Sequence, residues 1–141
     1  MKANELMIGD LVIDAEFEER PRVDVIECIE PNRVMLRHSV LYTPIEFIKP
    51  IPLTEEILEK KGFIRLCGQY ALPVAEGEGV MVNIFSNLAD YPNNNGTMLV
   101  NIKHLYTEAK IAITYVHELQ QALRLCVSLN RNNWNIYGKK E

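Results

Sequence analysis

The middle of this 141-residue chain constrains the fold most, because three prolines interrupt an otherwise strand-like sequence there. Pro44, Pro50 and Pro52 have no N–H to donate to a sheet ladder, so this stretch is expected to be a sheet edge or a connector. We therefore expect an N-terminal part at residues 1–53 and a C-terminal part at residues 54–141. The two parts are small enough to share one core.

The residues after the prolines carry the clearest helix signals in the sequence. Thr54 is a favoured N-cap, and two glutamates follow it, where the helix dipole favours negative charge. Two lysines precede Gly62, which suits the C′ position, and Phe63 is placed to pack back on the last turn. The pattern predicts a short helix at residues 54–61.

The N-terminal part contains short segments rich in β-branched side chains, with turn signals spaced roughly every 8–12 residues. Pro31-Asn32 is one such signal and predicts a hairpin. This spacing is typical of small barrels and predicts an SH3-like β-barrel. The expected strands cover residues 8–13, 23–29, 34–36, 42–43 and 45–48.

The C-terminal part is expected to be a meander of antiparallel strands covered by a helix. In Val80–Phe85 and Met98–Lys103 every second residue is apolar, as in paired strands with one buried face: Val80, Val82 and Ile84, and Met98, Val100 and Ile102. Val116, Leu119 and Leu123 recur at helical spacing and predict a helix at residues 115–127, followed by a polar tail. The expected fold class is therefore α+β.

Composition and charge limit the classes of partner. Apolar residues make up 48% of the chain, but they form only short runs, so no membrane span is expected. The first residues lack the apolar stretch of a signal peptide, and a cytoplasmic protein is expected. Residues 1–62 hold 13 acidic and 8 basic side chains, a net charge of −5. Such a chain is a poor candidate for binding nucleic acid, which draws its affinity from neutralised phosphates.

The three cysteines, Cys28, Cys67 and Cys126, are far apart in the sequence and lie among apolar residues. Their odd number and wide spacing argue against a disulfide framework and a zinc site. We expect small buried hydrophobic side chains in a reducing compartment.

The segment His117-Glu118-Leu119-Gln120-Gln121 approaches the His-Glu-x-x-His pattern of zinc proteases, in which two histidines one helical turn apart hold the metal. Here Gln121 stands at the second histidine position, and an amide oxygen is a poor zinc ligand. We therefore expect no metal, no cofactor and no catalytic residue. His117, Glu118, Gln121 and Arg124 are instead expected to form a polar, partly exposed helix face.

Aromatic residues suggest an interaction surface. Tyr42 and Phe47 lie in the expected barrel, and small barrels often bind peptides through exposed aromatic side chains. Trp134 and Tyr137 lie in the polar tail, where a large aromatic side chain is expected to dock on its own chain or on a second copy. A homodimer is one arrangement that would use them.

Three segments resemble one family: Asn4–Val12 with its Ile-Gly-Asp-Leu-Val sequence, Ile51–Phe63, and Tyr115–Arg124 with its Tyr-Val-His-Glu-Leu-Gln sequence. The chain is similar to a large set of small proteins of Bacteroidetes-type bacteria, many of them encoded by prophages. That family has no assigned activity. The resemblance therefore implies a mobile-element setting and no mechanism.

The sequence favours a non-catalytic protein-binding or adaptor protein of phage or mobile-element origin. A nucleic-acid-associated accessory protein is the first alternative, because Arg20, Arg22, Arg33 and Arg37 would form a local basic face if they cluster. A metal-dependent hydrolase that uses His117 and Glu118 is the remote alternative.

Overall fold

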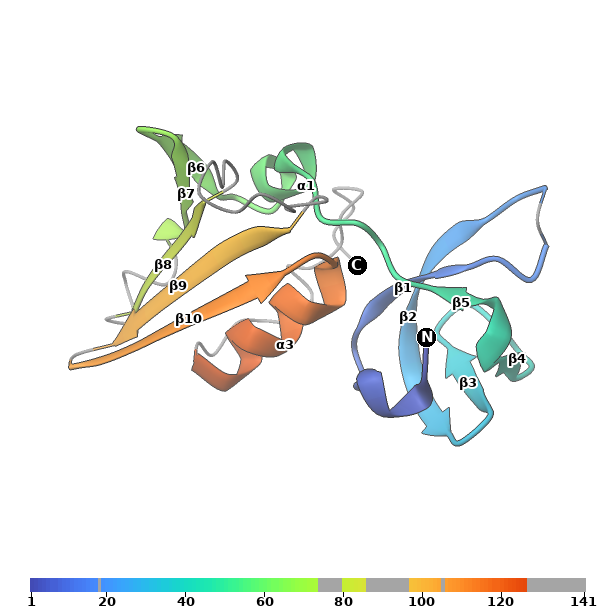
Figure 1. Ribbon diagram of the computed structural model, residues 1–141. Helices are drawn as coiled ribbons and strands as arrows, with labels where there is room; N and C mark the ends of the chain where they lie inside the picture. Colours follow the sequence, from blue (N-terminus) through green and yellow to red (C-terminus); the bar gives the residue numbers. More distant parts are fainter. Residues whose placement is uncertain (18, 74–79, 86–96, 105, 127–141) are drawn as a thin grey trace. The chain divides into compact units, whose positions relative to one another are not determined.

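The computed structural model describes residues 1–17, 19–73, 80–85, 97–104 and 106–126. It is an α+β protein with two antiparallel sheets and a C-terminal helix (Figure 1). The chain divides into two compact units. Unit 1 comprises Met1–Ile51 and Tyr115–Gln121, whereas unit 2 comprises Pro52–Thr114 and the residues from Ala122 onward.

Unit 1 is built on a five-stranded sheet with the order β4-β3-β2-β1-β5. Short 3-10 helices precede β1 and β5. The bounds are η1 (Ala3–Glu5), β1 (Leu11–Asp14), β2 (Arg22–Glu30), β3 (Arg33–Leu36), β4 (Thr43–Pro44), η2 (Ile45–Phe47) and β5 (Ile48–Lys49). The described strand pairings do not close this sheet, because β4 and β5 remain at its two ends. The closed SH3-like barrel expected from the sequence is therefore not observed.

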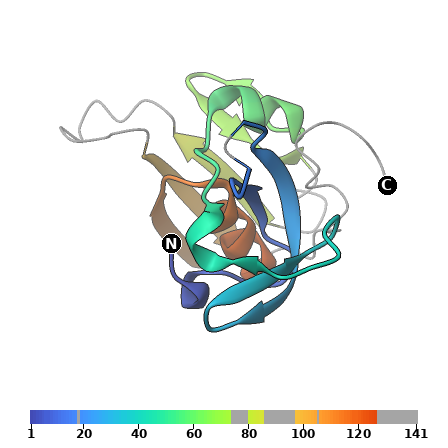
Figure 2. The ribbon, with the colours of Figure 1, turned by 90° about the vertical axis from the view of Figure 1, so that its right-hand side faces the viewer.

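The longest strand of unit 1, β2, carries the bend of the sheet. Its first half pairs with β1, and its second half pairs with β3. The register shifts between Ile26 and Cys28, and such a bulge bends a strand and increases its twist. The curved blue ribbon of β2 is visible in Figure 2. The predicted Pro31-Asn32 hairpin is confirmed by the pairing of Glu30 with Arg33.

The concave side of this sheet holds a small apolar core. Its buried members come from every strand but β4, and from the segment after η1: Leu6, Val12, Ile26, Val34, Leu36 and Ile48. Residues two apart on β3, Val34 and Leu36, both point inward, as strand periodicity requires.

The predicted helix at residues 54–61 is confirmed as α1 (Glu55–Lys60). The hydroxyl of Thr54 accepts a hydrogen bond from Ile57 N at 3.2 Å, which is the expected N-cap. At the other end, Gly62 has φ +89°, and Phe63 N donates to Leu58 O at 3.1 Å. These features define a Schellman motif, and the two residues whose apolar side chains such a motif brings near each other, Phe63 and Leu58, are both buried.

Unit 2 contains a five-stranded meander with the order β10-β9-β8-β7-β6. Consecutive strands are neighbours, and Figure 1 shows β8, β9 and β10 side by side. The bounds are β6 (Ile64–Leu66), β7 (Gln69–Ala71), β8 (Val80–Phe85), β9 (Met98–His104) and β10 (Thr107–Ile113). The predicted pairing of the two alternating segments is confirmed, with Val82 opposite Ile102 and Ile84 opposite Val100.

The hairpin between β6 and β7 places Cys67 on the surface. Cys67 and Gly68 both have positive φ, 51° and 81°, as a two-residue hairpin turn requires. Cys67 is exposed and Cys28 is half-buried. The expectation that these two cysteines are buried is therefore wrong for Cys67, because turn geometry and not local hydropathy decides its exposure. The side chain of Cys126 lies outside the described residues.

The C-terminal helix is α3 (Val116–Cys126), close to the predicted span of 115–127. The predicted apolar stripe of Val116, Leu119 and Leu123 is buried, as the helical spacing indicates. Its first turns belong to unit 1, whereas the sequence assigned this helix to the C-terminal part. No helix among the described residues is both long and apolar enough to cross a membrane.

Lys61, the C-cap residue of α1, gives a testable dependence of stability on pH. Burial lowers the pKa of its ammonium group from 10.5 to about 7. Below about pH 7 the lysine is charged in both states, and the folded state bears the full cost of burying that charge. Between about pH 7 and 10.5 the unfolded chain binds a proton that the folded chain does not, so stability rises with pH.

We expect Lys61→Met to remove this cost. At pH 6 the variant should be more stable than the wild type by about 1 kcal/mol, a figure reduced for partial solvent exposure. The difference should shrink as the pH rises to about 10. Urea unfolding of both proteins at several pH values measures it, and a difference that stays constant with pH would contradict the prediction.

Candidate functional site

The side chain of Gln120 on α3 forms two hydrogen bonds with the backbone at the start of β1. Its side-chain carbonyl accepts a hydrogen bond from Leu11 N at 2.9 Å, and its amide donates to Gly9 O at 3.3 Å. The side chain is almost fully buried. The carboxamide therefore satisfies one backbone donor and one backbone acceptor at the start of β1, as a neighbouring strand would. Sequence reasoning assigned no role to this residue.

Gln121, the next residue, holds the segment between η1 and β1. Its amide nitrogen donates to Glu5 O at 3.0 Å and to Asp10 Oδ2 at 2.8 Å. The same Asp10 oxygen accepts from Met7 N at 2.8 Å. The amide that replaces the second histidine of the zinc-protease pattern is thus bound to the protein itself.

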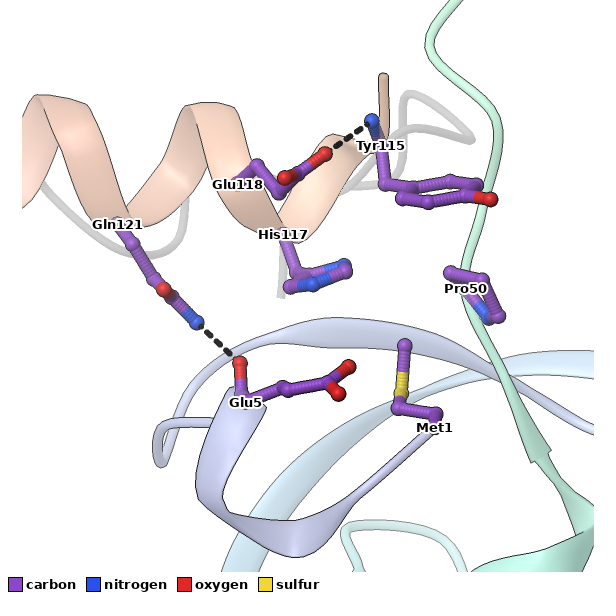
Figure 3. A pocket seen from close by; sticks show the side chains of 7 residues that line it. All are labelled: Met1, Glu5, Pro50, Tyr115, His117, Glu118 and Gln121. Carbon is purple, nitrogen blue, oxygen red and sulfur yellow. Dashed lines mark hydrogen bonds between the residues drawn. The ribbon is translucent and has the colours of Figure 1, made fainter. Parts of the chain in front are cut away.

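A pocket of about 500 Å³ lies beside this anchor, within unit 1. It is lined by residues at or just before η1, by the proline after β5, and by residues at or just before the first turns of α3 (Figure 3): Met1, Glu5, Pro50, Tyr115, His117, Glu118 and Gln121. The pocket thus brings together three of the four residues of the predicted polar helix face. The fourth, Arg124, is half-buried and does not line it.

His117 is buried, which differs from the partly exposed position expected for it. Its side chain is 4% exposed, and its ring stacks on Tyr115 with the centroids 5.9 Å apart. Nδ1 of this imidazole is buried and has no hydrogen-bond partner among the described residues. A buried polar atom without a partner costs about 1–3 kcal/mol of stability. His117 therefore lines the pocket with a polar side chain whose Nδ1 has no hydrogen-bond partner among the described residues.

Glu118 has a structural role at the start of α3. Its carboxylate accepts a hydrogen bond from Tyr115 N at 2.9 Å, the contact that a glutamate at the third helical position makes in a capping box. The same bond is drawn in Figure 3. This contact places the negative charge at the positive end of the helix dipole. Glu118 and His117 line one pocket, but Glu118 is engaged in capping.

The described residues do not support a metal centre. No group of three or more His, Cys, Asp or Glu side chains within this part of the chain is arranged to hold an ion. The pocket itself offers one imidazole and two carboxylates, Glu5 and Glu118, of which the second caps the helix.

Two residues of the predicted interaction surface, Tyr42 and Phe47, do not line the pocket. Tyr42 and Phe47 are both half-buried. The guanidinium of Arg33 covers the Tyr42 ring at 4.1 Å, and hydrogen bonding to Glu30 raises the pKa of the Tyr42 phenol to about 12. Trp134 and Tyr137 lie outside the described residues. The structure brings neither Tyr42 nor Phe47 to the pocket.

The arginines of the predicted basic face pair with carboxylates. Arg22 lies 3.6 Å from Asp14, Arg33 lies 3.0 Å from Glu30 and Arg37 lies 2.6 Å from Glu27. Their charges are compensated locally. Phosphate binding at these three positions would first have to break an ion pair, which disfavours a nucleic-acid surface there.

The unsatisfied imidazole predicts a stabilising substitution. In His117→Phe the phenyl ring keeps the stacking on Tyr115 and removes the buried polar atom, so we expect the free energy of unfolding to rise by about 1 kcal/mol. Urea unfolding followed by circular dichroism measures the change. His104→Phe is the control, because His104 is exposed on β9 and its replacement should have almost no effect. A destabilised His117→Phe variant would show that the imidazole is satisfied after all.

Comparisons of the chain with protein-family models, with curated proteins and with solved structures find no match. We therefore infer function from the geometry of the pocket.

Proposed function

We propose that this chain is a non-catalytic binding protein that acts through contacts with another protein, made at the pocket beside the start of α3. The observation that carries the proposal is the buried Nδ1 of His117 in a pocket wall, without a partner among the described residues. Polar groups left unsatisfied in a native structure are often found at functional sites. The half-buried Tyr115 and Pro50 add apolar surface next to it, as binding pockets typically have.

The arrangement of unit 1 supports the same proposal. A sheet with the order β4-β3-β2-β1-β5 and a 3-10 helix before its last strand is compatible with an open form of an SH3-like barrel. Small barrels of that type commonly bind peptides. The resemblance in the sequence adds a phage or mobile-element setting to this proposal.

The two alternatives have less support. Metal-dependent hydrolysis would need a metal site, and the described residues offer no suitable group of ligands. Nucleic-acid binding would need an unpaired basic face, and three of the four arginines considered for it form ion pairs.

Capture of partners with matched variants tests the proposal. The tagged wild type, Tyr115→Ala and Tyr106→Ala are incubated with a lysate of the source organism, and retained proteins are identified by mass spectrometry. Tyr106 is a fully exposed tyrosine beside β10, so it controls for loss of any surface ring. We expect a discrete protein that the wild type and Tyr106→Ala retain and that Tyr115→Ala retains at least tenfold less. No retained protein, or equal retention by all three, would contradict the proposal.

A further inference from the structure

The side chains that line the pocket differ in chemistry from one wall to another. Met1, Pro50 and the Tyr115 ring supply apolar surface. Glu5 supplies a carboxylate that extends below the His117 ring (Figure 3). None of the seven lining residues has a cationic side chain, and the one ammonium group among them is the α-amino group of Met1. The pocket therefore joins apolar walls to an acidic end.

The net charge of the pocket decides which ligands it favours. A helix N-terminus by itself attracts anions, and the pocket lies at the start of α3. Here, however, Glu118 already places a carboxylate at that end of the helix, 2.9 Å from Tyr115 N. The exposed Glu5 adds a second negative charge, so the two carboxylates exceed the single α-ammonium group of Met1. The sum favours a cation.

The imidazole of His117 points to the same kind of ligand. Nδ1 is buried and without a partner, and the whole side chain is 4% exposed. In the tautomer with its proton on Nε2, Nδ1 is an acceptor and needs an N–H donor. His117 and the flexible Met1 side chain both line the pocket, so a small movement of the pocket wall would give a donor access to Nδ1.

We propose that this pocket binds the cationic side chain of a lysine or arginine of the partner protein. The methylene groups of that side chain lie along Met1 and Pro50, and its N–H groups donate to Glu5 and to His117. Long basic side chains join an apolar stem to a charged end, which matches the two kinds of wall. A free polyamine carries several charges along its length and matches this division less well. The inference rests on the proposed function, because it names the group that the protein partner supplies.

Nuclear magnetic resonance with the full chain tests the proposal. The probes are capped pentapeptides with glycines around one central residue: lysine, arginine, norleucine, citrulline or glutamate. Spermidine is titrated separately. Signals of Tyr115, His117 and Gln121 report on the pocket. One side chain in one pocket gives weak binding, on the order of millimolar, which chemical-shift titration measures.

Two variants and one control measure how much the carboxylates of Glu5 and Glu118 contribute to peptide binding. Glu118→Gln keeps a side-chain carbonyl that can cap the helix, because glutamine also serves in a capping box. Glu5→Gln changes an exposed side chain, and its backbone carbonyl still accepts from Gln121. Glu46→Gln is the matched control, since Glu46 is likewise an exposed glutamate in a 3-10 helix of unit 1.

We expect the lysine and arginine peptides to shift the pocket signals of the wild type and of Glu46→Gln. The double variant Glu5→Gln, Glu118→Gln should bind at least about tenfold more weakly, which corresponds to the loss of a charge-assisted contact. Equal binding of norleucine or citrulline, preference for glutamate, binding of spermidine without the peptides, or no binding at all would each overturn the proposal.

The same variants separate this inference from the proposed function. If Tyr115→Ala loses the captured protein and the double variant retains it fully, the partner does not place a lysine or arginine side chain in the pocket. The proposal that the pocket binds a protein is then still supported. If no protein is captured, protein binding fails, whatever the peptides do.

Discussion

Replacing Gln120 by methionine should lower the free energy of unfolding by about 2–4 kcal/mol. Methionine nearly keeps the volume of the side chain but removes the acceptor for Leu11 N and the donor to Gly9 O. Leu11 N would then be buried without a partner, and the half-buried Gly9 O would lose its donor. A buried polar group without a partner costs about 1–3 kcal/mol, and a half-buried one costs less. Urea unfolding followed by circular dichroism measures the loss.

Gln121→Met is the matched comparison for this prediction. It removes two hydrogen bonds at the neighbouring position, but Gln121 is only half-buried, so water can replace part of what is lost. We therefore expect a clearly smaller effect, about 1 kcal/mol. Equal losses for the two variants, or a neutral Gln120→Met, would show that α3 is not held to β1 by this carboxamide.

The second large effect is expected in unit 2, at Tyr70 on β7. This side chain is fully buried, and it lies opposite Ile84 of β8. Its hydroxyl donates to Glu59 of α1 at 3.4 Å. Tyr70→Ala should cost about 3–5 kcal/mol, because it removes a large buried ring and leaves a cavity that rigid neighbours fill only in part. Thermal and urea unfolding measure it.

Tyr70→Phe separates the ring from the hydroxyl. It keeps the packing and removes only one long hydrogen bond, so we expect a loss of about 0.5 kcal/mol. If Tyr70→Phe were as damaging as Tyr70→Ala, the contact with Glu59 and not the ring would hold α1 on the sheet.

Local features of the sequence determined the elements. Thr54, Gly62 and Phe63 set both ends of α1, because each cap is made by residues within one turn of the helix end. The alternation in β8 and β9 likewise predicted their shared buried face, since side chains alternate along a strand. The sequence analysis did not identify the full extent of β10 (Thr107–Ile113), because polar residues on an edge strand weaken the alternation.

The tertiary structure decided the site and the buried polar groups. Asp24 appears in the sequence as one polar residue of a strand, yet its buried carboxylate accepts from His38 N at 3.2 Å. Gln120 meets Leu11 across 109 residues, and His117 is buried beside Tyr115 in a pocket that Glu5 completes from the other end of the chain. Helical spacing predicts which residues share a face, but what that face meets depends on segments far away in the sequence.

The sequence by itself determined the caps and the strand faces, because those depend on near neighbours. Only the fold decided that the segment resembling a zinc-protease motif, residues 117–121, binds the backbone near β1 through its glutamines and lines a pocket.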